Sequence, residues 1–246
     1  MDVFFRQYFN FHIISDNFSY ILGGFGITLE LAVLSGALAL AWGLVLAVLR
    51  QTPGRMAAPL RFLVIAYIDV FRGVPLLLII LLISGSFPYI FTGSLSFIGI
   101  PHWFGRSDPF WYGVMAISLT YGAYMAEVYR AGIEAVPRGQ MEAARSLGMS
   151  HRQAMRTVIV PQAIRKVIPP LLNDFIALMK DTSLVLVISA FEVVQRGYDV
   201  QSETLNSSAL TLGAVLFLLV TLPLARMVDR LIAGQQAKYQ RGLVGA

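Results

Sequence analysis

Long apolar stretches recur along the chain and are separated by shorter polar segments. A helix rises about 1.5 Å per residue, so roughly 20 apolar residues are needed to cross the hydrocarbon of a bilayer. The first stretch carries one charged residue, Glu30, and residues 205–225 carry none. The pattern predicts five membrane-spanning helices, the fourth of them broken near residue 181. Their expected bounds are residues 21–49, 62–87, 110–131, 160–191 and 205–230.

One long polar stretch, residues 134–156, lies between the third and fourth apolar segments. Within it, Pro137 can begin a helix and Gly148 can end one. Three apolar or small residues recur between them at helical spacing: Met141, Ala144 and Leu147. We therefore expect a short amphipathic helix over about residues 138–148 that lies flat on the membrane surface. Such a helix suits either close contact with another protein or a resting place on anionic lipid, and the pattern favours neither.

The overall composition agrees with lipid as the surrounding medium. The 246 residues are 57% hydrophobic and 13% charged, whereas soluble domains carry about 25% charged residues. We find no internal repeat and no soluble insert of domain size. The expected organisation is a single membrane domain over residues 1–246, in which the first span directs insertion because the N-terminal residues lack the pattern of a cleavable signal peptide.

The net charge of +5 follows the predicted topology. Of the 19 Lys and Arg residues, three lie between the first and second spans, seven around the polar stretch after the third span, and four after the fifth span. On the opposite side lie only Arg6 and Arg106. By the positive-inside rule, the amino terminus is expected outside and the carboxyl terminus in the cytoplasm. This distribution disfavours a nucleic-acid partner.

Ionisable residues within the apolar segments need a partner or a task, because each costs about 2.5 to 3.5 kcal/mol on insertion scales. Asp69 and Arg72 are three residues apart, as are Glu127 and Arg130, and this spacing permits an ion pair on one helix face. We interpret both pairs as structural. At the break in the fourth span, Asp181 and the hydroxyl residues after it are expected to cap a new helix.

Three acidic residues are candidates for contact with a cargo. Glu192 and Asp199 are seven residues apart, which on a helix places them within about 20° of the same direction. Two carboxylates on one face would hold an α-ammonium group and, in a basic cargo, a second cation. The alternative is that Glu192 pairs with Arg196 and that Asp199 reaches water. Glu30 is the third candidate, and its alternative is to extend to the interface.

Several motifs resemble those of the permease subunits of binding-protein-dependent ABC importers. EAARSLG at 142–148, followed by VIVP at 158–161, resembles the EAA signature of that family, with Val158 and Val160 where the pattern has Ile and Leu. Five residues match the signature: Glu142, Ala143, Ala144, Gly148 and Pro161, the last interpreted as structural. Three segments resemble the polar amino acid branch: YIDVFRGVPLL at 67–77, YMAEVYRAGIEAVPRGQ at 124–140 and PQAIRKVIPPLLNDFIALMKDTSLV at 161–185.

The resemblance implies an all-α membrane protein with the five-span, type I ABC importer permease fold, in the inner membrane of a bacterium. It implies a second permease copy or a sister permease, two ATPase subunits, and an external solute-binding protein that delivers the cargo. In this family the EAA segment forms a coupling helix that docks into the ATPase. That role falls on Arg138, Glu142, Ala143, Ala144 and Gly148. The implied cargo is a polar amino acid, and the acidic candidates favour a basic or zwitterionic one.

The sequence offers no catalytic site of its own. A phosphate-cradling loop needs GxxxxGK[ST], and no lysine here is followed by Ser or Thr. We therefore expect ATP and Mg²⁺ on the partner ATPase, with no cofactor or metal bound by this chain. A membrane enzyme is disfavoured, because cysteine is absent and the three histidines, His12, His102 and His151, are scattered. A channel or ion-coupled carrier without an ATPase is the remaining alternative, and the EAARSLG segment argues against it.

Overall fold

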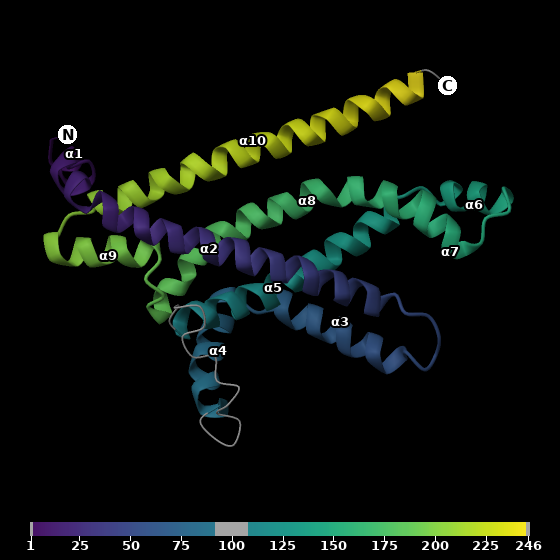
Figure 1. Ribbon diagram of the computed structural model, residues 1–246, viewed down its shortest axis with the longest axis horizontal. Helices are drawn as coiled ribbons and strands as arrows, with labels where there is room; N and C mark the ends of the chain where they lie inside the picture. The colour runs from purple at the N-terminus through teal and green to yellow at the C-terminus, as the bar shows by residue number, and fades with distance from the viewer. Residues whose placement is uncertain (1, 92–107, 245–246) are drawn as a thin grey trace.

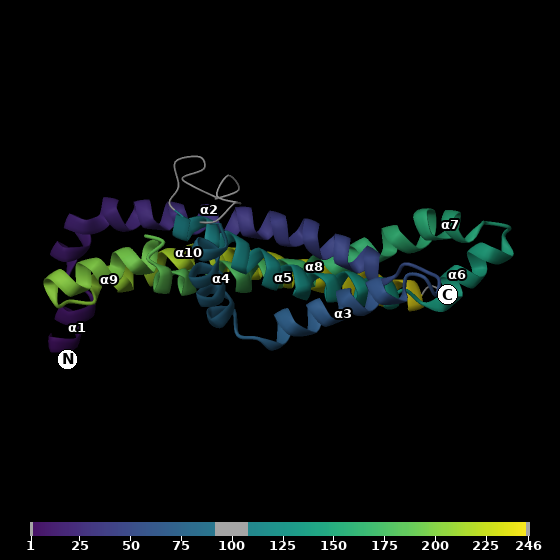
Figure 2. The same cartoon turned by 90° about the horizontal axis from the view of Figure 1, so that it is seen from below.

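A computed structural model describes residues 2–91 and 108–244, which form an elongated bundle of helices (Figure 1). The helices are α1 (Asp2–Tyr8), α2 (Phe11–Arg50), α3 (Ala58–Gly73), α4 (Leu76–Phe91), α5 (Asp108–Glu134), α6 (Arg138–Ser146), α7 (His151–Ala154), the π-helical η3 (Met155–Ile159), α8 (Val160–Asp181), the 3₁₀ helix η4 (Thr182–Ile188), α9 (Val193–Thr204) and α10 (Ser208–Val244). Helices α2, α8 and α10 run along the longest axis (Figures 1 and 2).

Helix α2 packs along α5 at the centre of the bundle. Their close approach depends on Gly43, where an added Cβ would lie 2.9 Å from the carbonyl oxygen of Gly122 and 2.9 Å from the Cβ of Met125. Small residues at such crossings let the backbones of membrane helices come together. Further along the same two helices, the buried side chains of Leu31 and Ile117 belong to the main apolar core.

The predicted second span, residues 62–87, is not one continuous helix. α3 ends at Gly73 and α4 begins at Leu76, and the two helices are bent by 108°. Pro75 explains the break, because its ring pushes the preceding residue out of the α region. Val74 is accordingly extended, with φ −93° and ψ 131°. Hydropathy did not reveal the break, because both halves of the segment are apolar. After the break, α4 turns away from the long axis of the bundle (Figure 1).

Two helical stretches among the described residues are each long and apolar enough to cross a membrane: Val3–Arg50 and Ser208–Gln235. The bent pair of α3 and α4 adds a third if it counts as one broken span. The count of five crossings therefore stays a prediction.

A wide helical turn, η3, joins α7 to α8 just before Pro161. Proline has no N–H, and its ring clashes with the carbonyl four residues earlier. Here the turn widens, and the N–H of Val160 bonds to the carbonyl of Met155, five residues back. Such a π-turn lets the helix continue past the proline instead of ending there. Pro161 thus has a local structural effect on the segment that follows α6.

The fourth apolar segment changes helix type close to the predicted break, because α8 ends at Asp181 and the chain continues as the 3₁₀ helix η4. The expected capping is wrong. Asp181 makes no side-chain cap bond to η4, and its carboxylate instead accepts from the Tyr121 hydroxyl at 2.8 Å. The hydroxyls of Thr182 and Ser183 donate backwards, to carbonyls in the last turn of α8.

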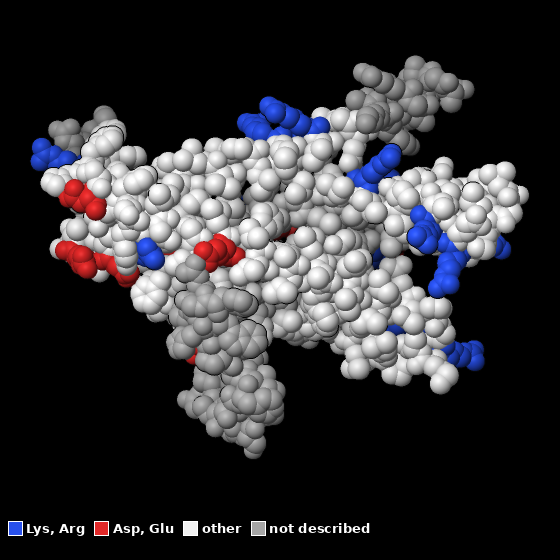
Figure 3. All heavy atoms as spheres, in the orientation of Figure 1, with Lys and Arg blue, Asp and Glu red and all other residues white. Residues whose placement is uncertain are grey.

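Charged side chains separate along the long axis of the molecule. On the face shown in Figure 3, Lys and Arg lie over the end that carries α6 and α7 and along the edge formed by α10, with two smaller basic patches in the half that carries α9. The Asp and Glu visible on this face lie in the half that carries α9. The loop between α2 and α3 lies at the same end as α6 (Figure 1). This face thus shows the excess of basic groups around α6 on which the predicted orientation depends.

Candidate cargo pocket and coupling helix

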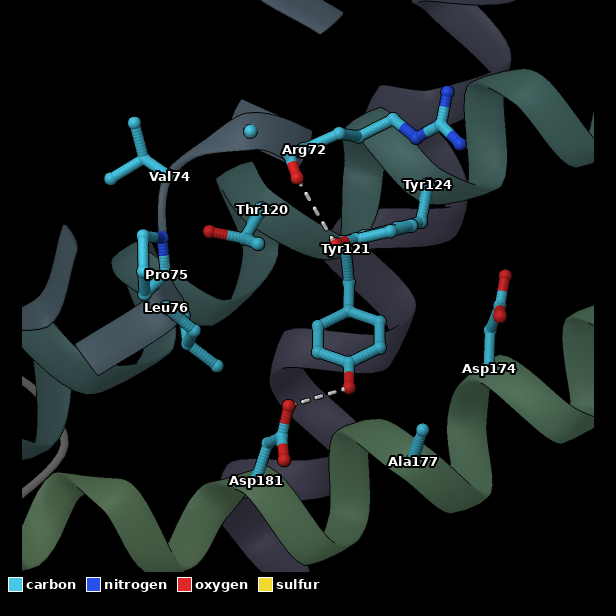
Figure 4. A pocket seen from close by; sticks show the side chains of 11 residues that line it. Arg72, Val74, Pro75, Leu76, Thr120, Tyr121, Tyr124, Asp174, Ala177 and Asp181 are labelled. Carbon is cyan, nitrogen blue, oxygen red and sulfur yellow. Dashed lines mark hydrogen bonds between the residues drawn. The ribbon is translucent and has the colours of Figure 1, made fainter. Parts of the chain in front are cut away.

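A cavity of about 530 Å³ lies at the bend between α3 and α4. Its lining comes from three elements: Arg72 to Leu76 at the bend, Thr120, Tyr121 and Tyr124 on α5, and Asp174, Ala177 and Asp181 on α8 (Figure 4). Two interruptions of regular helix therefore meet at this cavity, the break at Pro75 and the end of α8. Irregular backbone at membrane depth is tolerated only where it is buried in protein or lines a cavity.

Two oxygen atoms of this cavity are buried without a hydrogen-bond partner among the described residues, Oγ1 of Thr120 and Oδ2 of Asp174. Thr120 is 3% exposed, so its hydroxyl is not left to bulk water. Buried polar atoms are nearly always paired, and those that are not call for an explanation. Asp181, by contrast, is held by Tyr121 (Figure 4). The cavity thus offers two carboxylates, one held by a neighbour and one with an unpaired oxygen.

Arg72 supplies the positive charge of the cavity. Its guanidinium lies over the ring of Tyr124, 5.5 Å from the ring centroid, in the geometry of a cation–π contact. The predicted ion pair with Asp69 is wrong: among the described residues no ion pair joins the two, and Asp69 is exposed on α3. A guanidinium and carboxylates around one cavity suit a ligand that carries both signs of charge.

Glu192, a predicted cargo contact, is fully buried and caps helix α9. Its carboxylate accepts from the backbone N–H groups of Val194 and Gln195, both at 2.8 Å, and from the Thr28 hydroxyl at 3.4 Å. The alternative, a pairing of the Glu192 side chain with Arg196, is wrong. The Arg196 side chain instead donates to the carbonyl of Tyr20 at 2.7 Å and lies over its ring.

The other two cargo candidates lie away from the cavity. The Asp199 carboxylate accepts from the Tyr20 hydroxyl at 2.9 Å and from the Gln195 amide at 3.0 Å. It does not share a helix face with Glu192, because Glu192 precedes the first turn of α9. Glu30 is exposed on α2. The structure therefore does not bring the three predicted acids together.

Sequence reasoning missed the lining of the cavity, although a signal for it was present. Thr120 and Tyr121 carry no charge, so a search for ionisable residues within apolar segments does not find them. The useful signal was Pro75 within an apolar run, because a proline there predicts a break and an interior site beside it.

The predicted pair of Glu127 and Arg130 forms, at 2.8 Å, and belongs to a larger network. Arg50, at the end of α2, also contacts Glu127, and Arg130 bonds Glu134 one turn further on at 2.7 Å. Spacing along α5 revealed the local pair, whereas Arg50 comes from another helix. The network ties the end of α2 to α5, near the start of the segment that leads to α6.

Helix α6 (Arg138–Ser146) occupies most of the stretch predicted for the amphipathic helix. Its end is the Schellman arrangement: the N–H of Met149 bonds to the carbonyl of Ala144 at 3.2 Å, and the N–H of Gly148 bonds to that of Arg145 at 3.0 Å. Gly148 has φ +84°, a conformation that costs glycine least. The chain therefore turns sharply back towards α7 at the predicted position.

One side of α6 packs on the bundle and the other is uncovered. Ala144 is buried, and Met141 packs against a small apolar cluster formed with η3 and α8. Glu142 and Ala143 are exposed. Leu147, which helical spacing groups with Met141 and Ala144, instead follows the last helical residue and is 79% exposed. An exposed leucine beside exposed small residues is the kind of surface that another protein covers.

The fold and these sites define a helical transport subunit of the membrane. The family model described as "Binding-protein-dependent transport system inner membrane component" matches residues 39–235, and the chain belongs to this family. The sequence resemblance to ABC importer permeases and the expected all-α, type I importer permease fold are confirmed, whereas the count of five spans stays a prediction.

Curated relatives narrow the similarity to amino acid permeases. The chain is 38% identical to the probable glutamine ABC transporter permease protein GlnM of Bacillus subtilis (strain 168) over 231 residues, 94% of this chain and 100% of that protein. It is 34% identical to the arginine transport system permease protein ArtQ of the same strain over 188 residues, 76% of this chain and 78% of that one. It is also 38% identical to the glutamate/aspartate import permease protein GltK of Escherichia coli O157:H7 over 183 residues, covering 74% and 77%.

Solved structures agree on the fold. A structure titled as an amino acid ABC transporter with histidines superposes with a TM-score of 0.74 at 33% identity, covering 88% of this chain and 94% of that one. A chain of the MetNI methionine ABC transporter superposes with a TM-score of 0.70 at 19% identity, covering 88% and 96%, and supports the fold alone.

Proposed function

We propose that this chain is the membrane-spanning subunit of an importer that moves a polar amino acid and is driven by ATP hydrolysis on partner subunits. The observation that carries the proposal is the uncovered face of α6, a rigid short helix at the end of the bundle where basic residues gather. The similarity to permeases named for glutamine, arginine and glutamate/aspartate supports an amino acid as cargo.

In this proposal α6 is the coupling helix. Arg138, Glu142 and Ala143 are exposed and face the ATPase, and Ala144 seats the helix on the bundle. Gly148 allows the sharp return towards α8, so that movement of α6 is transmitted to α8 through η3. ATP and Mg²⁺ bind to the ATPase, and this chain contributes no catalytic group.

The cavity at the α3–α4 bend is the proposed cargo site. Its unpaired oxygens on Thr120 and Asp174 would accept hydrogen bonds from the α-ammonium group, and Arg72 would hold the carboxylate. A second acidic residue, Asp181, favours a zwitterionic or basic amino acid over an acidic one. The cavity takes over the role that the sequence had suggested for Glu192.

The assembly and orientation follow from the family. Two ATPase subunits, a second permease copy or a sister permease, and an external solute-binding protein complete the importer in the bacterial inner membrane. The amino terminus lies outside and the carboxyl terminus in the cytoplasm, with α6 on the cytoplasmic side, which the separation of charge along the molecule supports.

ATP-driven uptake in reconstituted vesicles tests the coupling role. Ala143→Trp places a large ring on the exposed face of α6 and is expected to abolish both ATP-driven uptake and co-purification of the ATPase. Ala58→Trp adds the same ring at an exposed position at the start of α3 and is expected to change neither. Uptake that stays coupled to ATP in the Ala143→Trp variant would contradict the proposal.

A further inference from the structure

A second and larger cavity, of about 850 Å³, lies near the α6 end of the bundle. It is a groove between the last turns of α2 and α5 and the segment from α7 to α8. Its walls are mainly apolar and include Leu44, Val48, Ile133, Met155, Ile164 and Val167. Among its lining residues, all within the described part of the chain, the single charged side chain is Arg152.

The walls of this groove are open along their length. Val48 is 60% exposed and Ile164 is 50% exposed. The polar side chains near its mouth already bond to backbone carbonyls of α2. The Gln51 amide donates to the Ala47 carbonyl at 3.2 Å, and the Thr52 hydroxyl donates to the Val48 carbonyl at 3.4 Å. A polar solute would therefore find few free partners, whereas a hydrocarbon chain would cover exposed apolar surface.

Arg152 gives the groove a charged mouth. It is exposed, and within residues 2–91 and 108–244 no acidic side chain pairs with it. The predicted first span ends at residue 49, and the groove follows α2 from Leu44 and continues past its last residue, Arg50, to Pro53. It thus crosses the level where hydrocarbon gives way to lipid headgroups. Basic pockets between membrane helices at this level suit anionic headgroups.

We propose that this groove binds a phospholipid with an anionic headgroup, whose phosphate pairs with Arg152 and whose acyl chain lies along Val48 and Ile164. Arg152 and Met155 belong to the segment that returns the chain from α6 to α8. A bound lipid therefore contacts the segment through which α6 is joined to the bundle. This site is separate from the proposed cargo cavity and does not depend on which amino acid is carried.

The test titrates phosphatidylglycerol into the purified transporter complex that contains this chain and follows the lipid-bound species by native mass spectrometry. Phosphatidylcholine serves as the neutral comparison and is expected to bind more weakly. Arg152→Gln is expected to weaken phosphatidylglycerol binding at least tenfold, because a charge-assisted bond to phosphate is lost. Val48→Trp fills the apolar wall and is expected to reduce binding of both lipids.

Two matched variants control for general effects. Arg156→Gln removes the same charge four residues further on, outside the groove. It is expected to weaken phosphatidylglycerol binding no more than about fivefold, as for any basic residue near an anionic surface. Val45→Trp adds the same ring at an exposed position of α2 outside the groove and is expected to change nothing. Equal losses for Arg152→Gln and Arg156→Gln would overturn the proposal. So would unchanged binding in Arg152→Gln and Val48→Trp, or crosslinks from residue 48 showing that another subunit covers the groove.

Discussion

Two regions of the molecule bury oxygen-bearing side chains between helices, and they satisfy them differently. At the start of α9, the Glu192 carboxylate accepts from two backbone N–H groups and the Thr28 hydroxyl. At the α3–α4 bend, Oγ1 of Thr120 and Oδ2 of Asp174 find no partner among the described residues. A buried carboxylate with a full set of donors serves the fold, whereas one with a vacant bonding position is available to a ligand.

The contrast shows that acidity within an apolar segment does not identify a cargo site. Glu192 and Asp174 are both acidic residues near the break at the end of α8, and of the two the sequence predicts a cargo contact for Glu192 alone. Only the count of hydrogen-bond donors around each carboxylate separates a helix cap from a binding group.

The largest effect is expected from Asp174→Asn. If the Asp174 carboxylate holds the ammonium group of the cargo, its loss should lower kcat/KM for uptake about tenfold to a hundredfold, because a hydrogen bond to a charged group contributes about 1.5 to 3 kcal/mol. Radiolabelled amino acid uptake into vesicles is the measurement. Asp69→Asn removes an exposed carboxylate outside the cavity and should leave uptake unchanged. Normal uptake in Asp174→Asn would contradict the proposal that this cavity binds the cargo.

Glu192→Ala should act on stability instead. The variant loses the N-cap of α9 and leaves backbone N–H groups unpaired, and a cap contributes about 0.5 to 2 kcal/mol. The expected result is a lower temperature of thermal unfolding in detergent, with uptake per folded complex unchanged. Glu203→Ala, at an exposed position of the same helix, should alter neither. A loss of uptake with an unchanged unfolding temperature would indicate that Glu192 contacts the cargo.

Two threonines extend the comparison to the hydroxyl groups of the same two regions. The Thr28 hydroxyl bonds to the Gly24 carbonyl, to Glu192 and to the N–H of Val193. Thr28→Val should therefore destabilise the protein by about 1 to 3 kcal/mol, since buried partners are left unpaired. Thr120→Val removes a hydroxyl without a partner and should leave stability equal or higher, while uptake falls a few-fold. Equal destabilisation in thermal unfolding of the two variants would show that Thr120 has a structural partner.

The smallest effect is expected from Arg50→Gln. Glu127 is bonded by both Arg50 and Arg130, so the loss of Arg50 leaves the carboxylate with one cation. The free energy of unfolding should fall by less than about 1 kcal/mol, as for partly exposed ion pairs. Arg130→Gln should cost more, because it also releases Glu134. A larger loss of unfolding free energy for Arg50→Gln than for Arg130→Gln in denaturant would show that Arg50, on α2, is the main partner of Glu127.

Local signals made some of this structure predictable from sequence. The bounds of α6 depend on Pro137 and Gly148, both of which act within one turn of their position. The Glu127–Arg130 pair depends on spacing along one helix. Glu192 combines a local cap, made to the N–H groups of Val194 and Gln195, with a contact to Thr28. Spacing does not reveal the second contact, because Thr28 is 164 residues away in the chain. The cavity was missed because hydropathy averages over Pro75 and so hides the bend that creates it.

The π-helical turn η3 also determines how the segment before it, which contains α6 and α7, is rotated about the axis of α8. One additional residue in a helical turn rotates the chain before it by about 100° relative to the chain after it. The direction in which α6 projects from the axis of α8 therefore depends on the extra residue within Met155–Ile159. A one-residue deletion there would restore ordinary helix, swing α6 sideways and leave its exposed face misaligned, even with every side chain of α6 intact.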